Sequence, residues 1–81
     1  MQYYSYILKS LKDSKFYYGS TSDVNKRLLK HNSGQVTSTK HRRPFVLHFV
    51  EEHISRSLAF QREHFYKSID GYNHLKEKGI I

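Results

Sequence analysis

The sequence predicts a small α/β (α+β) protein, with a three-stranded antiparallel sheet flanked by helices in the order β-β-α-β-α. Three short runs are rich in aromatic and β-branched residues, which favour strands. Two other segments repeat their apolar residues with the period of a helix. The first two strand runs are separated only by a short polar stretch, which is typical of a β-hairpin. The chain has 81 residues and is too short for more than one domain, so we expect residues 1–81 to form one unit.

The predicted hairpin consists of residues 3–8 and residues 16–20. Both faces of the first strand carry aromatic or aliphatic side chains, so we expect it at the centre of the sheet rather than at its edge. The hairpin places Tyr6 and Tyr17 on neighbouring strands, although the sequence does not determine their register.

The first helix is predicted over residues 23–33. Thr21, Ser22 and Asp23 can each accept the free N–H groups that open a helix. Gly34 supplies the left-handed residue that commonly closes one. The start and the end of this helix are therefore both indicated by residue types that suit them.

Arg27 and His31 lie four residues apart in this helix, in or beside the apolar stripe of Val24 and Leu28. Residues that were merely solvated would lie on the opposite face, as Lys30 does. Two interpretations stay open. The Arg27 stem packs along the edge of the core and His31 is a satisfied, partly buried residue, or the pair serves a function.

Residues 34–44 are polar and lack periodicity, so we expect an exposed loop. The cations Lys40, Arg42 and Arg43, with neighbouring hydroxyl groups, suit contacts to phosphate, although a solvated charge cluster has the same composition. Residues 45–50 are the third predicted strand. Its two faces are both largely apolar, so we expect it to be covered on both sides.

The second helix is predicted over residues 55–69. The residues of the stripe that would face the core are Leu58, Phe65, Ile69, Tyr66 and Ala59. Asp70-Gly71 is expected to end this helix, and residues 72–79 could form a short C-terminal helix.

Glu63 falls on the shoulder of this stripe, between the core and solvent. From spacing alone, its ordinary interpretation is a surface ion pair with Lys67, four residues later. Such a pair stabilises a helix by only about 0.3–0.5 kcal/mol.

Charge and composition narrow the function classes. Lys and Arg number 14 against 7 Asp and Glu, for a net charge of +7, which favours nucleic acid first and a membrane surface second as partners. The absence of cysteine excludes disulfides and thiolate metal sites. No segment approaches the roughly 18 apolar residues that span a bilayer. Because a strand-like run begins at residue 3, we expect no signal peptide and a cytoplasmic location.

Four short motifs follow one another along the chain. They are Y-S-Y at 4–6, Y-Y-G at 17–19, G-x-T-x-D-x-x-x-R-x-x-x-H at 19–31, and A-x-x-R-E-x-x-x-K at 59–67. In this order and spacing they resemble the GIY-YIG endonuclease domain. The closest resemblance is to its short stand-alone bacterial members, which are similar to the N-terminal catalytic domain of the excision-repair incision nuclease.

The first two motifs depart from the family pattern. Tyr4 and Ser5 replace the Gly and Ile of the first triplet, and Tyr18 replaces the Ile of the second. These are packing positions, so the changes concern the shape of the substrate side. The residues that the family uses chemically are all present: Tyr6, Tyr17, Arg27, His31 and Glu63.

The resemblance implies metal-dependent hydrolysis of DNA, with branched, nicked or damaged structures met in repair or recombination as candidate substrates. Glu63 would be the ligand of one Mg²⁺ or Mn²⁺ ion, and the substrate phosphate would complete this weak site. Arg27 would clamp the scissile phosphate. Tyr6 would be the general base or position the water, with Tyr17 supporting it, and His31 would bind a tyrosine or a phosphate oxygen.

A free phenol has a pKa of about 10, so little phenolate exists at neutral pH. Arg27 and the metal must therefore lower the pKa of Tyr6, or the proton must leave during attack. The cations expected to contact DNA are Lys40, Arg42, Arg43, Lys30 and Lys67.

Two other functions stay open. The chain could be a nucleic-acid-binding module that does not cut, as its basic charge and altered first triplet suggest. It could also need a protein partner to select its substrate, since so small a chain has little surface for selection. A zinc site is not supported, because cysteine is absent and no two histidines lie four residues apart on a predicted helix. The sequence does not indicate the oligomeric state.

Overall fold

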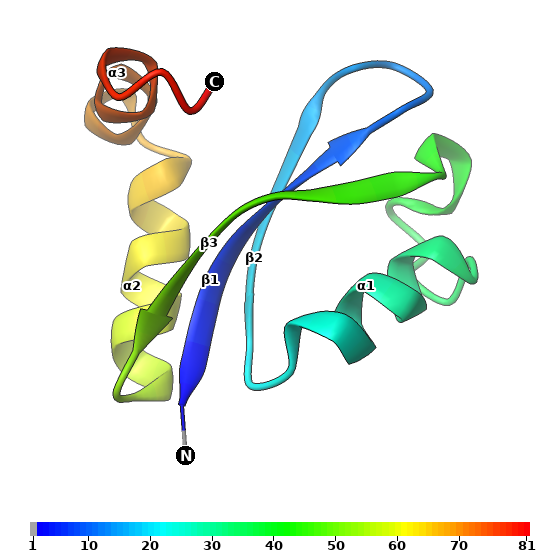
Figure 1. The fold of residues 1–81 in the computed structure, drawn as a ribbon, viewed down its shortest axis with the longest axis horizontal. Helices are drawn as coiled ribbons and strands as arrows, with labels where there is room; N and C mark the ends of the chain where they lie inside the picture. The colour runs from blue at the N-terminus through cyan, green and yellow to red at the C-terminus, as the bar shows by residue number, and fades with distance from the viewer. Residues whose placement is uncertain (1) are drawn as a thin grey trace.

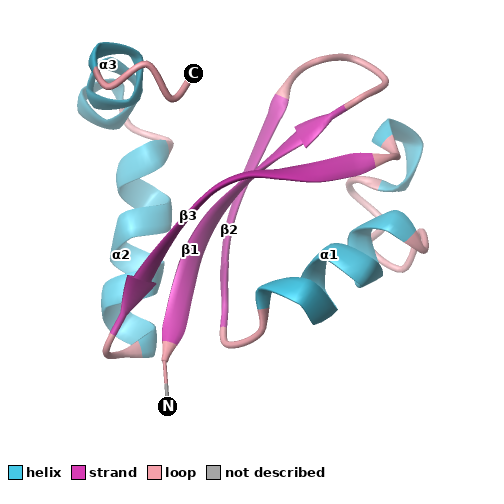
Figure 2. Cartoon of the chain, viewed as in Figure 1, coloured by secondary structure: helices cyan, strands magenta, loops and turns pink. Residues whose placement is uncertain are grey.

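The computed structural model describes residues 2–81. Its elements are β1 (Tyr3–Ser10), β2 (Phe16–Thr21), α1 (Val24–Asn32), the 3₁₀ turn η1 (Lys40–Arg42), β3 (Phe45–His53), α2 (Arg56–Tyr66) and α3 (Ile69–Glu77). The strands form one antiparallel sheet in the order β2-β1-β3, so the predicted fold class and the central position of the first strand are confirmed. Figure 2 shows the three strands crossing between the helices. Among residues 2–81, no helix has the length and apolar character needed to cross a membrane.

The sheet lies between α1 on one side and α2 with α3 on the other (Figure 1). Side chains alternate along β1, so Tyr6 and Leu8 face α1 while Ile7 faces the other two helices. Tyr6 and Leu8 pack with Phe45 in one cluster, and Ile7 packs with Tyr66 from α2 and Leu75 from α3 in the second. Each face of this small sheet therefore has its own apolar cluster.

The register of the hairpin places a glycine directly opposite Tyr6, the tyrosine of β1 that is predicted to carry chemistry. Tyr6 pairs with Gly19, and Leu8 pairs with Tyr17, so all four residues belong to the same face of the sheet. A Cβ atom at position 19 would lie 2.3 Å from the hydroxyl oxygen of Tyr6. Gly19 is thus required because the phenol of Tyr6 lies against the backbone of β2.

The helix α1 begins and ends as the sequence predicts. The Asp23 carboxylate accepts a hydrogen bond from the backbone N–H of Lys26, at 3.0 Å, and so caps the first turn. Gly34 follows the helix with φ of +83°, the left-handed conformation expected of it.

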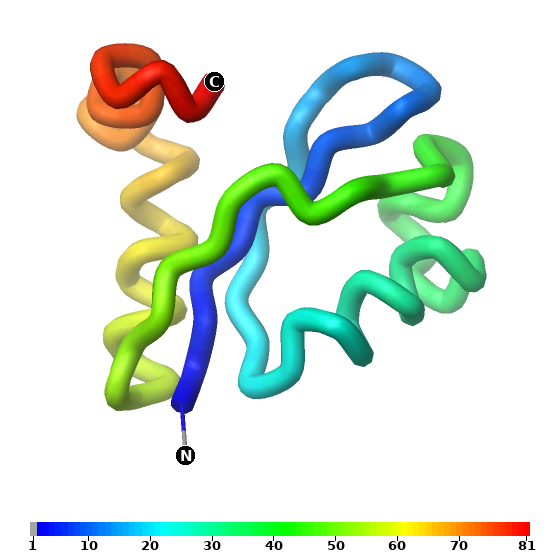
Figure 3. The backbone as a smooth tube through the Cα atoms, in the orientation of Figure 1, coloured from blue at the N-terminus to red at the C-terminus, as the bar shows by residue number. Residues whose placement is uncertain are grey.

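The prediction that residues 45–50 are covered on both faces is wrong. β3 is an edge strand, and Val46, Leu47 and Val50 are each about 40% exposed. The nine-residue helix α1 packs on the end of the sheet near Phe45 and leaves the rest of its face open (Figure 3). Apolar side chains in a strand therefore do not guarantee a covering layer when the chain is this short.

The second predicted helix, residues 55–69, ends earlier than expected. α2 ends at Tyr66, and the Ser68 side chain caps α3 by accepting from the backbone N–H of Gly71, at 3.0 Å. Asp70-Gly71 therefore lies in the first turn of α3 instead of ending the preceding helix. The expected C-terminal helix exists, but it spans Ile69–Glu77 rather than residues 72–79.

The predicted core stripe of the second helix is confirmed at Ala59 and Tyr66 and wrong at Leu58 and Ile69. Leu58 and Ile69 are 44% and 81% exposed, whereas Ala59 and Tyr66 are buried. The buried side of α2 also includes the partly buried polar residues Arg62 and Glu63. A helical stripe drawn from apolar residues alone therefore does not locate the middle of this side.

We predict that Gly71→Ala destabilises the protein by about 3 kcal/mol, because the added Cβ would clash with backbone that cannot move independently. A Cβ at this position would lie 1.6 Å from the carbonyl oxygen of Phe65. The free energy of unfolding from urea titrations would test this. Gly79→Ala is the matched control: it has φ of +73° but no atom within 4 Å, and should lose only about 1 kcal/mol. Equal losses in the two variants would contradict the packing argument.

Candidate active site

Four of the five residues predicted to carry chemistry meet on the α1 face of the sheet, over β1 and β2. His31, in the last turn of α1, is fully buried. Its Nε2 lies 3.4 Å from the Tyr6 hydroxyl, and its Nδ1 lies 2.9 Å from the Thr39 hydroxyl. Its ring also meets the Tyr17 ring edge-on, with 4.8 Å between centroids. His31 is therefore a buried and hydrogen-bonded residue, as the first of the two interpretations expects. The phenols of Tyr6 and Tyr17 are both among its neighbours.

Thr39 was not predicted as part of this cluster. It is buried although it belongs to the polar stretch 34–44, and its hydroxyl also lies 3.4 Å from the Val36 carbonyl oxygen. If the Thr39 hydroxyl donates to Val36, it accepts from Nδ1–H of His31, and Nε2 is left to accept from Tyr6. If Thr39 donates to His31 instead, Nε2–H faces the phenol oxygen. No pattern in the sequence distinguishes Thr39 from its exposed neighbours.

Arg27 lies beside the phenols of both Tyr6 and Tyr17, which favour its cationic form and raise its pKa further. Its Nε is buried and has no hydrogen-bond partner among residues 2–81. A buried donor without an acceptor is unfavourable, and most such groups in native proteins are satisfied. The guanidinium group therefore has an unused donor within this cluster.

Burial raises the pKa of the Tyr6 phenol, and the neighbouring Arg27 guanidinium offsets only part of this rise. Tyr6 is 1% exposed, whereas Tyr17 is partly exposed. The expectation that Arg27 lowers the pKa of Tyr6 is therefore not met by the residues of the chain, because desolvation is the larger effect. At neutral pH the Tyr6 phenol keeps its proton.

Burial, with Arg27 nearby, lowers the pKa of His31 to about 4. The ring is therefore neutral at physiological pH, and one of its nitrogens is an acceptor. Arg27 is consequently the charged member of the cluster on this face.

Glu63 approaches β2 from the opposite face of the sheet. Its Oε1 accepts a hydrogen bond from the Ser20 hydroxyl at 2.8 Å, and its side chain is 14% exposed. Ser20 directly follows Gly19, against which Tyr6 lies from the α1 side. The two phenols and the carboxylate thus reach the same short part of the edge strand, and the Glu63 charge contributes to the raised pKa of Tyr6. Ser20 is the second contact residue that the sequence did not indicate.

The ion pair predicted between Glu63 and Lys67 is present, with Nζ 2.9 Å from Oε2. No group of three or more His, Cys, Asp or Glu side chains within residues 2–81 could hold a metal ion. A carboxylate is nevertheless the donor that Mg²⁺ prefers, and this ion commonly takes one or two carboxylates with water and substrate oxygens. Because the Lys67 side chain is half exposed, water can replace its ammonium group at Oε2, and the Glu63 carboxylate then has the chemistry of a single protein ligand.

The cations expected to contact DNA lie in separate places. Lys30 borders a groove of about 200 Å³ beside α1, which Lys26 and Arg27 also line. Lys67, at the end of α2, is paired with Glu63.

The remaining three cations lie in and beside η1. Arg42 is only partly exposed; its Nε donates to the Asp13 carboxylate at 2.8 Å, and it stacks on Phe45. Lys40 and Arg43 are exposed, with Arg43 Nε donating to the Lys40 carbonyl at 2.7 Å. Lys40 and Arg43 are therefore accessible, whereas Arg42 also joins η1 to the hairpin.

The profile of the GIY-YIG catalytic domain matches residues 2–76, and the chain belongs to this family. It is 40% identical to the UPF0213 protein SSP2268 of Staphylococcus saprophyticus, over 93% of this chain and 92% of that protein. It is 37% identical to the UPF0213 protein YazA of Bacillus subtilis, over 83% of this chain and 68% of YazA. The solution NMR structure of the UPF0213 protein BH0048 from Bacillus halodurans is 35% identical, covers 95% of this chain and 84% of its own, and has a TM-score of 0.54. The resemblance to short bacterial members is thus confirmed.

The low pKa of His31 predicts that acid destabilises the protein before its carboxylates titrate. Below pH 6.5 the unfolded chain takes up a proton that folded His31, with a pKa of about 4, does not. The free energy of unfolding should then fall by up to about 1.4 kcal/mol per pH unit between these values. Hydrogen bonds from Arg42 hold the pKa of Asp13 at about 2, so this group contributes only at lower pH.

Urea titrations at pH 7, 6 and 5 would measure this slope, which we expect His31→Gln to flatten. His41→Gln, at an exposed histidine, is the control and should keep the parent slope. Parallel profiles of the parent and His31→Gln would contradict the assignment.

Proposed function

We propose that this chain is a metal-dependent endonuclease that hydrolyses phosphodiester bonds of DNA. Family membership supports the reaction class. The observation that carries the proposal is Arg27, a cation beside two phenols that lines a groove with Lys26 and Lys30 and has no carboxylate partner among residues 2–81. A phosphate in this groove would neutralise the charge and accept hydrogen bonds from the guanidinium group. The net charge of +7 favours approach of the polyanion.

In this proposal, Arg27 holds the scissile phosphate from the groove that it shares with Lys26 and Lys30. Glu63 would hold a Mg²⁺ or Mn²⁺ ion, which when bound neutralises charge on phosphoryl oxygens and supplies an activated water. Ser20 fixes one carboxylate oxygen of Glu63 at the edge of β2.

Burial distinguishes the roles that we propose for the two phenols. Tyr17 is partly exposed, so its hydroxyl can reach the attacking water and act as the base or position that water. Tyr6 is buried against Gly19, where it would orient Arg27 and neutral His31. Because burial keeps Tyr6 protonated, its phenol suits this orienting role better than that of a standing phenolate base.

The unit that acts, its location and its substrate are inferred together with the reaction. We propose that residues 1–81 act as one nuclease unit in the cytoplasm, on branched, nicked or damaged DNA formed during repair or recombination. Lys40 and Arg43 are the exposed cations that would contact flanking phosphates. Selection of the substrate by a protein partner is compatible with the small surface of the chain.

We expect the purified protein to cleave DNA with Mg²⁺ or Mn²⁺ in a panel of single-stranded, nicked, branched and duplex substrates. Glu63→Gln, Arg27→Lys and Tyr17→Phe should each lower kcat/KM by about 100-fold or more, because each removes a group that contacts the reacting phosphate, water or metal. Gln61→Ala, an exposed change on the same helix as Glu63, is the matched control and should retain activity.

Two results would overturn the enzyme assignment. Equal cleavage by Glu63→Gln and the parent would mean a contaminant or another site. Salt-dependent DNA binding without turnover under either metal would indicate the non-catalytic binding module instead.

A further inference from the structure

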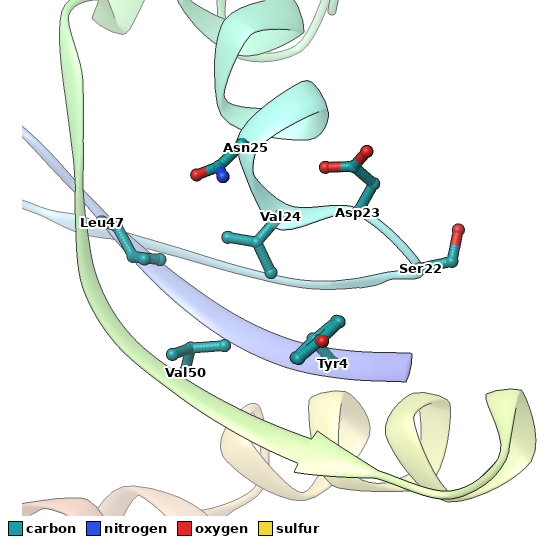
Figure 4. A pocket seen from close by; sticks show the side chains of 7 residues that line it. All are labelled: Tyr4, Ser22, Asp23, Val24, Asn25, Leu47 and Val50. Carbon is teal, nitrogen blue, oxygen red and sulfur yellow. The ribbon is translucent and has the colours of Figure 1, made fainter. Parts of the chain in front are cut away.

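A pocket of about 390 Å³ lies between the first turn of α1 and the part of the sheet that α1 leaves open. Its volume falls in the range of small-molecule sites. Figure 4 shows Tyr4 from β1, Val24 from α1, and Leu47 and Val50 from β3 around it. Tyr4 precedes Tyr6 by two residues on β1, so it belongs to the same face of the sheet as the candidate active site. The pocket therefore combines one aromatic ring with an aliphatic wall.

The rim of this pocket is polar and joins the basic groove. Ser22, Asp23 and Asn25 provide a hydroxyl, a carboxylate and an amide at the opening. Ser22 and Asp23 also line the groove on the other side of the helix start, together with Lys26, Arg27 and Lys30. An apolar pocket and a cationic groove thus share the same two residues.

We propose that this pocket receives an unpaired nucleobase of the strand whose phosphate Arg27 holds. The inference rests on the proposed function, since its ligand is the DNA substrate, and it adds a substrate class: DNA with an unpaired base beside the bond to be cut. Bases stack on aromatic side chains in single-strand-binding proteins, and a base still stacked and paired in a duplex cannot enter such a pocket. The amide and hydroxyl of the rim match the donors and acceptors of a base edge.

A protein side chain is the other class of occupant for an apolar pocket. The cationic groove argues for nucleic acid, because Lys26, Arg27 and Lys30 add positive charge immediately beside the pocket. Tyr4 also stands where the family triplet has Gly, and a Gly at this position would leave the pocket without its aromatic ring.

The test is fluorescence of a single-stranded oligonucleotide that contains 2-aminopurine, titrated with the full chain in EDTA so that no cleavage occurs. We expect saturable quenching by the parent as the base stacks on Tyr4. Tyr4→Ala should weaken single-strand binding about tenfold and abolish the quenching, with duplex affinity unchanged. Tyr4→Phe should retain both. Tyr72→Ala, which removes an exposed tyrosine of α3 on the opposite side, is the matched control.

Leu47→Glu is the second variant, because its exposed position allows the substitution even if Tyr4→Ala fails to fold. It should lower single-strand affinity more than duplex affinity. Equal single-strand binding by the parent and both variants would overturn the base pocket and favour a protein side chain as its occupant, even if the enzyme cleaves DNA. Quenching without cleavage under any metal would overturn the nuclease and retain the pocket. Absence of all DNA binding would overturn both.

Discussion

The close approach of the Tyr6 phenol to the backbone of Gly19 is the constraint on which the rest of the site depends. The ring fills the space that a side chain at position 19 would occupy, and its hydroxyl lies at the edge strand rather than in the middle of the sheet. His31 and Arg27 on α1 then pack beside this phenol. From the other face, Glu63 reaches the next residue of the same strand. An edge strand with a glycine in it thus allows groups from both faces of the sheet to approach the same short segment of backbone, where we propose that the phosphate binds.

The two partly buried arginines of α1 and α2, Arg27 and Arg62, differ in whether the fold supplies them with an anionic partner. Arg62 donates to the Glu51 carboxylate at 2.9 Å and lies over the rings of Phe65 and Tyr66. Burial opposes ionisation of Glu51, but hydrogen bonds from Arg62 and Tyr66 outweigh it and lower the pKa of this carboxyl. Arg27 has no such carboxylate partner among the described residues and keeps a free Nε. The charge of Arg62 is neutralised by Glu51 within the fold, whereas the charge of Arg27 is available to an external anion.

The parts that the sequence predicted are those decided by local residue chemistry. The cap of α1 and the glycine after it follow from Asp23 and Gly34 alone. The cap of α3 at Ser68 was missed because apolar residues keep the spacing of a helix from α2 into α3, so the sequence shows no interruption where α2 ends. The inner side of α2 was misplaced because Glu63 is a polar residue held by Ser20, a partner 43 positions away. Thr39 shows the same limit, since only the folded chain brings it to His31.

The short α1 explains why the molecule has an open apolar surface beside a cluster of buried polar groups. Nine residues extend about 13–14 Å along a helix, which is less than the length of the strands beneath it. α1 covers Tyr6 and Phe45 but leaves Leu47 and Val50 exposed. A longer helix would close this face, gain apolar burial, and remove the pocket beside the Lys26–Lys30 groove. The exposed apolar wall is therefore a cost in burial, which the nucleobase that we propose as its ligand would recover when it binds.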